Sequence, residues 1–307
     1  MTPDADPTRV RPTTAFALLA AAAVGIQVGA ATVASRFVLP QTDPISLALM
    51  RYTIGALSLA PFVLAVPLPR FRARDLAPMA ALGILQFAVL VALLNVGLTY
   101  IPAARAALVF SAFPLLTMVL AAALGRERMT TRKTIGVVLT IIGVGLALGE
   151  KVLDVGAVTY RGEAAVLGAA LCGAICSVLY RPYLQRYPAL AVSGYAMLAS
   201  VLFLGGVGVW QGGLTNPMTL TQAALGAVIF IGLSSGIAYF ILLWALARTT
   251  PTRVTVFQAL APITATGLGI TLLGESVTAQ FITGLCAVGA GLVVALREGR
   301  SEKTQAI

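Results

Sequence analysis

The segment Leu272–Gly284, LLGESVTAQFITG, decides the fold because a related pattern occurs earlier in the chain. The earlier copy is Leu124–Gly136, LGRERMTTRKTIG, and both copies place a glutamate at a corner between two apolar runs. An offset of 148 residues, the separation between Glu127 and Glu275, aligns further pairs: Arg105 with Arg253, Pro114 with Pro262, Thr130 with Thr278, Gly136 with Gly284 and Gly143 with Gly291. A match at one constant offset indicates an internal repeat.

The chain around these corners is strongly apolar. Of its 307 residues, 59% are hydrophobic and 10% are charged, and the mean hydropathy is +0.94, which is typical of a membrane protein. A hydrocarbon core of roughly 30 Å needs about 20 apolar residues per helix. Ten runs fit: Thr14–Phe37, Ile45–Val66, Leu76–Leu98, Pro102–Leu124, Thr134–Gly149, Gly162–Tyr180, Ala191–Trp210, Thr221–Leu246, Thr252–Leu273 and Thr278–Leu296. The sequence therefore predicts an all-α membrane protein with ten transmembrane helices.

Each half contains five runs, and an odd number makes the second half enter the membrane from the opposite side. We therefore expect two inverted-topology five-helix repeats, over residues 14–149 and 162–296, with cytoplasmic tails over residues 1–13 and 297–307. Glycines seven residues apart lie on one helix face. The fifth run carries such a pair in Gly136 and Gly143, and the tenth in Gly284 and Gly291, so these two runs are predicted to pack together. The alternative role of the four glycines is to line the transport path.

The positive charges indicate the orientation. With a cytoplasmic N-terminus, 16 of the 21 Lys and Arg residues lie on the cytoplasmic side, so both termini are predicted to be cytoplasmic. The other five are expected outside or at an outer helix end: Arg36, Arg51, Arg105, Lys151 and Arg161. We interpret the net charge of +10 as a topology signal and a contact with anionic lipid, and we expect no nucleic-acid partner.

The corners GRERMT and LGESVT, the prolines of the fourth and ninth runs and the glycine-rich closing runs resemble the EamA family of the drug/metabolite transporter superfamily. The segment Gly25–Ala56, GIQVGAATVASRFVLPQTDPISLALMRYTIGA, resembles the first two helices of that family, including the arginine at Arg51. Within the family, the chain is most similar to bacterial amino-acid exporters of the YddG type.

The resemblance implies a multi-pass carrier of the bacterial inner membrane, in which the first, third, fourth, sixth, eighth and ninth helices surround a central cavity. It implies export of amino acids, with broad specificity that includes hydrophobic or aromatic ones, by alternating access. Export of another small organic solute, such as a nucleoside, polyamine or drug, is the alternative. We expect a monomer whose partners are its small-molecule substrate and membrane lipid.

Polar side chains inside the membrane are functional candidates, because they are costly unless they pair or face water. Gln27 and Gln86 lie near the middle of their runs, where each amide binds substrate or forms an interhelical hydrogen bond. Ser111 and Gln258 precede prolines that interrupt the fourth and ninth runs and free backbone carbonyls, although a kink alone is the other interpretation. Ser235 and Tyr239 lie one turn apart on the eighth run and suit a neutral or aromatic substrate.

Several residue types are missing or misplaced for catalysis. The chain has no histidine, and its eleven acidic residues lie in loops, tails or helix ends, so we predict neither an enzyme nor a proton relay. The three cysteines are interpreted as small buried residues, and no metal or cofactor is expected.

The two repeated glutamates are candidate corner or gate residues. An inverted repeat places Glu127 and Glu275 on opposite faces of the membrane. Each glutamate is predicted to lie near the N-terminus of the following helix, with Thr130 and Thr278 as the N-caps. The alternative role is a gate contact on each side, made and broken as access alternates.

Overall fold

The structure of the chain is a computed structural model that describes residues 12–67, 69–126, 130–149, 157–248, 254, 257 and 260–296. The first half contains α1 (Pro12–Val38), η1 (Leu39–Gln41), α2 (Pro44–Leu64), α3 (Ala73–Gly83), η2 (Ile84–Val89), α4 (Leu90–Tyr100), α5 (Ala103–Phe110), α6 (Phe113–Ala123) and α7 (Thr131–Gly149). The second half contains α8 (Ala157–Leu179), α9 (Arg181–Leu184), α10 (Ala189–Trp210), η3 (Pro217–Thr219), α11 (Gln222–Leu246), α13 (Leu260–Leu273) and α14 (Ala279–Leu296). The described part of the chain is helical, which confirms the predicted class.

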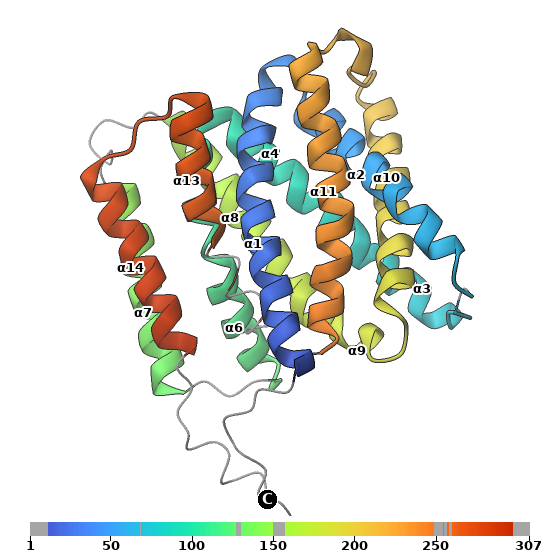
Figure 1. Cartoon of the computed structure of the whole chain (residues 1–307), viewed down its shortest axis with the longest axis horizontal. Helices are drawn as coiled ribbons and strands as arrows, with labels where there is room; N and C mark the ends of the chain where they lie inside the picture. The colour runs from blue at the N-terminus through green and yellow to red at the C-terminus, as the bar shows by residue number, and fades with distance from the viewer. Residues whose placement is uncertain are drawn as a thin grey trace, which may run out of the picture.

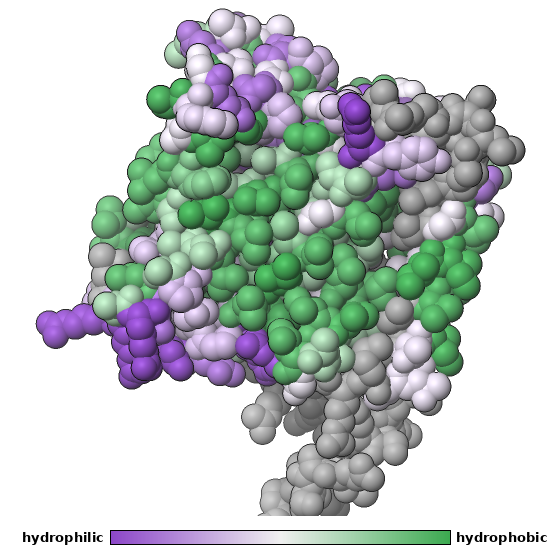
Figure 2. Space-filling model, turned by 180° about the vertical axis from the view of Figure 1, so that it is seen from behind, coloured by the Kyte–Doolittle hydropathy of each residue, from purple (hydrophilic) through white to green (hydrophobic). Residues whose placement is uncertain are grey.

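The surface is that of a membrane protein. Seven helices of the described residues are long and apolar enough to cross a bilayer, and three shorter helices are also apolar. Figure 2 shows the apolar side chains as a continuous belt, with hydrophilic side chains gathered toward the two ends of the bundle. A lipid bilayer favours this arrangement, because apolar side chains face the hydrocarbon and polar ones reach water.

Two spans depart from a regular α-helix. The third span runs without a break from Ala73 to Tyr100, but its centre, η2, is a π-helical turn. The fourth span is interrupted between α5 and α6, where Pro114 occupies the first turn of α6. The structure thus confirms the predicted interruption before Pro114. It adds a π turn that the sequence did not reveal.

The pair α7 and α14 stands side by side at one edge of the molecule (Figure 1). A Cβ atom on Gly143 would lie 2.8 Å from the carbonyl oxygen of Gly284, and one on Gly291 would lie 2.7 Å from that of Gly136. Backbones this close leave no room for a side chain. Gly143 and Gly291 therefore allow the close contact of these two helices, which pack together as predicted, and Gly284 and Gly136 supply the carbonyls that they meet. The reciprocal contacts show that the helices run antiparallel.

The remaining helices also pair in a repeated pattern. In the first half, α1 packs against α11 and α13, and in the second half α8 packs against α4 and α6. Likewise, α2 packs against α11, whereas α10 packs against α3 and η2. The most extensive helix contacts thus join helices of different halves, and the centre of the bundle lies between the two halves.

Candidate functional site

A cavity of about 50 Å³ lies at the centre of the bundle, between α1, α2, the third and fourth spans and α11. Its polar lining consists of Gln27, Arg51, Gln86 and Tyr239. The other lining residues are aromatic or aliphatic: Val24, Val28, Tyr52, Leu90, Val91, Leu94, Phe110, Phe113, Ala238 and Leu242. The second span thus contributes to the wall, contrary to the expected set of helices. Neither α8 nor α13, which represent the expected sixth and ninth helices, contributes a lining residue within the described part of the chain.

Gln27 and Ser235 meet across the two halves of the chain. The Gln27 amide donates to the Ser234 hydroxyl at 2.9 Å and to the Ser235 hydroxyl at 3.5 Å. Gln27 therefore forms an interhelical contact and also lines the cavity, so both roles considered for it are compatible with the geometry.

Arg51 was misplaced by the charge count, which put it outside or at an outer helix end. Its side chain is 6% exposed, lines the cavity and donates from Nε to the Ser235 hydroxyl at 2.8 Å. An arginine at the centre of a membrane helix costs about 2.5–3.5 kcal/mol, and one hydrogen bond to a charged group returns about 1.5–3 kcal/mol. The hydrogen bond to Ser235 therefore does no more than offset the cost of placing Arg51 within the membrane. Because its position brings little or no gain in stability, Arg51 is a functional candidate.

Arg51 could have been found from the sequence. It is the one charged residue of the apolar run Ile45–Val66, and it lies well inside that run, not at its end. The positive-inside rule applies to loops and helix ends, so it does not place such a residue.

Gln86 lies in the π turn and reaches the second half of the chain. Its amide donates to the Tyr239 hydroxyl at 2.5 Å. An extra residue in a helical turn changes the direction of the side chains around it, and π turns are frequent at functional sites. The turn thereby presents Gln86 to the cavity while Phe87 packs edge-on against Tyr239, with ring centroids 4.3 Å apart.

The lining repeats the offset found in the sequence. Leu90, Val91 and Leu94 line the cavity from α4, and the residues 148 positions later, Ala238, Tyr239 and Leu242, line it from α11. The third and eighth spans therefore present the same helix face to the same space.

The structure does not bring every predicted site residue to the cavity. Ser111 is buried and donates to the carbonyl of Leu108 in its own helix, outside the cavity lining. Gln258 and Glu127 lie outside the described residues. Gln27, Gln86 and Tyr239 line the cavity together with Arg51. Ser235 is not among the lining residues, but its hydroxyl contacts Gln27 and Arg51.

Glu275 caps a helix of the other half, which corrects the prediction that it serves the helix that follows it. Its carboxylate accepts from the backbone amides of Ala103 at 2.8 Å and Ala104 at 3.2 Å, at the start of α5. Gly274, with φ of +64°, ends α13 and turns the chain toward this contact. Thr278 does cap α14 as predicted, because its hydroxyl accepts from the Phe281 amide at 3.2 Å.

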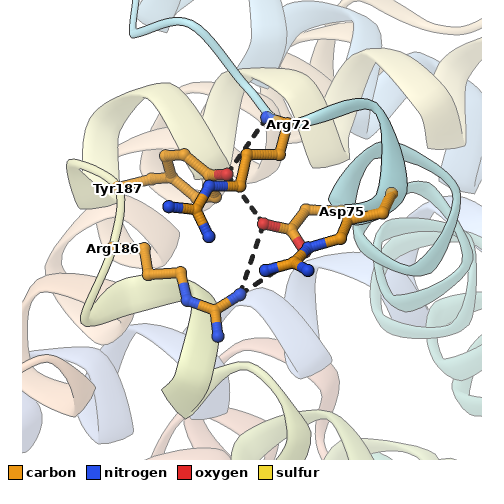
Figure 3. Close-up of polar contacts among 5 residues, drawn as sticks. Arg72, Asp75, Arg186 and Tyr187 are labelled. Carbon is orange, nitrogen blue, oxygen red and sulfur yellow. Dashed lines mark hydrogen bonds and ion pairs between the residues drawn. The ribbon is translucent and has the colours of Figure 1, made fainter.

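A second polar cluster lies at the opposite end of the third span from Glu275, between α3 and the turn after α9 (Figure 3). Asp75 accepts from the Tyr187 hydroxyl at 2.7 Å and lies 3.4 Å from Arg186, while the Arg72 amide donates to the Tyr187 hydroxyl at 3.1 Å. Asp75 occupies a helix end, as expected of the acids, but it is buried. It therefore ties the two halves together at this end.

The present cavity is too small for an organic solute. Its volume of about 50 Å³ compares with about 300 Å³ or more for small-molecule sites. Space of this size holds a few water molecules, so any larger ligand requires the surrounding helices to separate.

Comparisons with known proteins agree with this architecture. A family model described as the EamA-like transporter family matches residues 15–149 and 160–297. The chain is 30% identical over 233 residues to a probable terminal-alkyne amino-acid exporter of Streptantibioticus cattleyicolor, covering 75% of this chain and 76% of that protein. It is 29% identical over 222 residues to a probable amino-acid metabolite efflux pump of Salmonella typhimurium, covering 68% of this chain and 71% of that protein.

A solved crystal structure shares the fold, with a TM-score of 0.73 over 93% of this chain and 97% of the other. Sequence identity to it is 21%, so the likeness concerns architecture alone. The family model, by contrast, covers both halves of the sequence. The chain therefore belongs to the EamA-like transporter family and is a multi-pass membrane transporter, not an enzyme.

Proposed function

We propose that the protein exports amino acids of broad specificity, including hydrophobic or aromatic ones, across the bacterial inner membrane. The observation that carries this proposal is the central cavity, in which polar side chains of both halves meet an apolar wall. The named relatives are a probable amino-acid exporter and a probable amino-acid metabolite efflux pump, which supports the same substrate class.

The lining suits a molecule with one charged end and one apolar end. Gln27 and Gln86 supply amide donors and acceptors for ammonium and carboxylate groups. Phe110, Phe113 and Leu94 supply apolar and aromatic surface for a side chain. We assign Gln27, Gln86, Ser235 and Tyr239 to the substrate site and keep Ser111 and Gln258 as candidates for the opened cavity.

Transport then proceeds by alternating access between two inverted five-helix repeats, residues 14–149 and 162–296, with both termini in the cytoplasm. The antiparallel, reciprocal packing of α7 and α14 supports this symmetry. So does the shared offset of the lining residues on α4 and α11. The small cavity corresponds to a closed state, from which the two halves separate toward one side or the other.

Contacts between the halves at the two ends serve as gates in this proposal. Glu275 closes the outer end by holding the start of α5, and Asp75 with Arg186 closes the cytoplasmic end. Because Glu127 aligns with Glu275 at the repeat offset, we assign it the equivalent cytoplasmic role. Gate contacts of this kind must break and reform in each cycle.

A counterflow screen with purified protein in liposomes tests the proposed substrate class. Vesicles loaded with one unlabelled compound from a panel of amino acids, nucleosides and amines are assayed for accumulation of the same labelled compound. We expect accumulation with amino acids, strongest for apolar ones. Accumulation confined to nucleosides or amines contradicts amino-acid export and favours another organic solute.

A further inference from the structure

Arg51 is the one charged residue among the described residues that line the cavity. Its Nε atom donates to Ser235 at 2.8 Å, and none of the ion pairs among the described residues involves it. A guanidinium stays protonated in proteins and carries five N–H donors. The bond at Nε therefore leaves the two terminal nitrogen atoms available to an acceptor within the cavity.

Other arginines of the bundle are held differently. Arg105 pairs with the Glu163 carboxylate, and Arg186 lies beside Asp75. Arg36 and Arg126 donate to backbone carbonyls of Leu98 and Val178. Arg51 faces the neutral Ser235 hydroxyl, the cavity and the Tyr52 ring, whose centroid lies 5.5 Å from the guanidinium carbon, so a purely structural ion pair does not explain its position.

Snorkelling does not explain it either. A snorkelling arginine extends its charged group to the membrane surface, where water surrounds it. The Arg51 side chain is 6% exposed, and its Nε atom contacts Ser235 near the middle of α11. The positive charge is thus held at the level of the cavity.

We propose that Arg51 binds the carboxylate of the transported molecule, which makes a free carboxylate the group that this carrier requires. This inference rests on the proposed function and names the part of the substrate that is recognised. A guanidinium pairs with a carboxylate through two parallel N–H···O bonds, which fix orientation as well as charge. Ser235 orients Arg51 at Nε, and the Gln27 amide, which donates to the same hydroxyl, fixes that serine.

The partner of Arg51 is a carboxylate carried by an apolar molecule, because the remaining wall is apolar. Phe110 and Phe113 lie with ring centroids 5.5 Å apart and line the cavity together with Leu94. A small inorganic anion would satisfy the charge but would leave this wall without a ligand. The substrate class that fits is therefore an amino acid, or a related carboxylate, with an apolar side chain.

Ligand-induced thermal stabilisation of the purified wild-type protein tests the inference without a variant. The probes are L-phenylalanine, L-phenylalaninamide, phenethylamine and 3-phenylpropanoate, in chloride and in gluconate buffer. We expect the two carboxylates to bind roughly tenfold or more tightly than the amide and the amine, because a site built for a group rejects analogues that lack it. Equal stabilisation by the amide, or stabilisation that follows chloride alone, overturns the role of Arg51.

The outcomes separate this inference from the proposed function. If L-phenylalanine and its amide are transported equally, amino-acid export stands and the carboxylate requirement fails. If 3-phenylpropanoate binds but no amino acid is transported, amino-acid export fails and the carboxylate requirement stands. If neither carboxylate stabilises the protein, the inference is wrong.

Variants then place the effect at Arg51. Arg51→Gln is expected to lose the preference for carboxylates, and Arg51→Lys to keep part of it, since the charge remains and the two parallel hydrogen bonds do not. Arg248→Gln is the matched control, because Arg248 stacks on Trp244 at the end of α11, with Cζ 3.8 Å from the ring centroid and away from the cavity. An Arg51→Gln protein that folds and keeps the wild-type ratio of carboxylate to amide affinity contradicts the proposal.

Discussion

The Nε2 atom of Gln86 lies 2.5 Å from the hydroxyl oxygen of Tyr239, and this contact joins the π turn of the third span to the eighth span. The two residues belong to different halves of the chain, and both line the central cavity. A hydrogen bond between the two halves at the proposed substrate site would link substrate binding to the relative position of the halves in the proposed transport cycle.

Replacement of Gln86 by alanine is expected to reduce transport by about tenfold, the equivalent of a lost hydrogen bond of about 1.4 kcal/mol. Protein abundance is expected to stay intact, because the cavity contains space for water near the site. Initial rates of counterflow, normalised to protein in the vesicles, measure the effect. Unchanged transport would remove Gln86 from the site.

Tyr239→Phe separates the two functions of the Gln86 amide. It keeps the ring that packs against Phe87 but removes the hydroxyl that accepts from Gln86. If Gln86 acts only through Tyr239, the double variant is no worse than either single one; if it also contacts substrate, Gln86→Ala is more harmful than Tyr239→Phe.

Ser235→Ala removes the hydroxyl that accepts from both Arg51 and Gln27. We expect a several-fold rise in the substrate concentration that gives half-maximal transport, because the guanidinium loses its fixed orientation. Ser193→Ala is the matched control, since Ser193 is a buried serine whose hydroxyl has no hydrogen-bond partner. Equal kinetics for the two variants would show that Ser235 does not position Arg51.

The α7–α14 contact makes a prediction about stability alone. Gly143→Ala and Gly291→Ala are each expected to destabilise the protein by about 1–3 kcal/mol, because the added methyl group meets backbone atoms of the partner helix. Gly145→Ala and Gly289→Ala lie on the same helices with open space at the glycine, and are expected to be neutral or stabilising by up to about 1 kcal/mol. Thermal unfolding in detergent compares the pairs, and a uniform response to all four would contradict the packing account.

Glu275→Ala is expected to open the end of the bundle that we propose to face outward, because α5 loses the carboxylate that accepts from its first two amides. Opening is measured with the substitution Leu94→Cys and a maleimide that cannot cross the membrane. The labelling of this cysteine should increase several-fold when Glu275→Ala is added. The background lacks Cys172, Cys176 and Cys286. Thr278→Ala, which removes the cap of α14 and leaves the Glu275 carboxylate in place, is the control. A Glu275→Ala variant that lowers stability without changing labelling would leave a capping role and no gate.

Asp43 predicts a pH dependence at the loop before α2. Partial burial raises the pKa of Asp43, but hydrogen bonds from Ser46, Thr215 and Ile45 outweigh it and hold the pKa below its ordinary value of 3.8. A lowered folded-state pKa stabilises the fold above pH 3.8, and the contribution is lost as the pH falls through the folded-state value. Asp43→Asn still caps the helix, and it should weaken the dependence of the melting temperature on pH below pH 3.8. If the melting temperature of the variant falls with pH as steeply as that of the wild type, Asp43 is not the origin of the dependence.

The sequence predicted the features that depend on hydropathy and periodicity. Apolar runs, the constant offset and the glycine spacing led to the helical membrane fold and to the pairing of α7 with α14. The break before Pro114 followed from the missing N–H of proline. Each of these patterns either lies within a few turns of one helix or recurs at a constant spacing, so it can be recognised from the sequence without a structure.

Contacts between distant segments were not predictable in the same way. Glu275 caps α5 through the amide of Ala103, which is 172 residues away in the sequence, and no local pattern indicates a contact over that separation. Arg51 was assigned by a counting rule that ignores depth within a run, and the π turn at Gln86 has no clear pattern in the sequence. The two clearest polar candidates, Gln27 and Gln86, were nevertheless found by position alone.

Transport of labelled L-phenylalanine into liposomes, with and without unlabelled L-phenylalanine inside, tests most directly whether this cavity works by alternating access. The account predicts saturable uptake that internal amino acid accelerates several-fold, since the loaded carrier returns through the closed state more readily. An uptake rate that rises linearly with concentration and is the same with and without internal amino acid would contradict the account, because it would indicate a continuous pore.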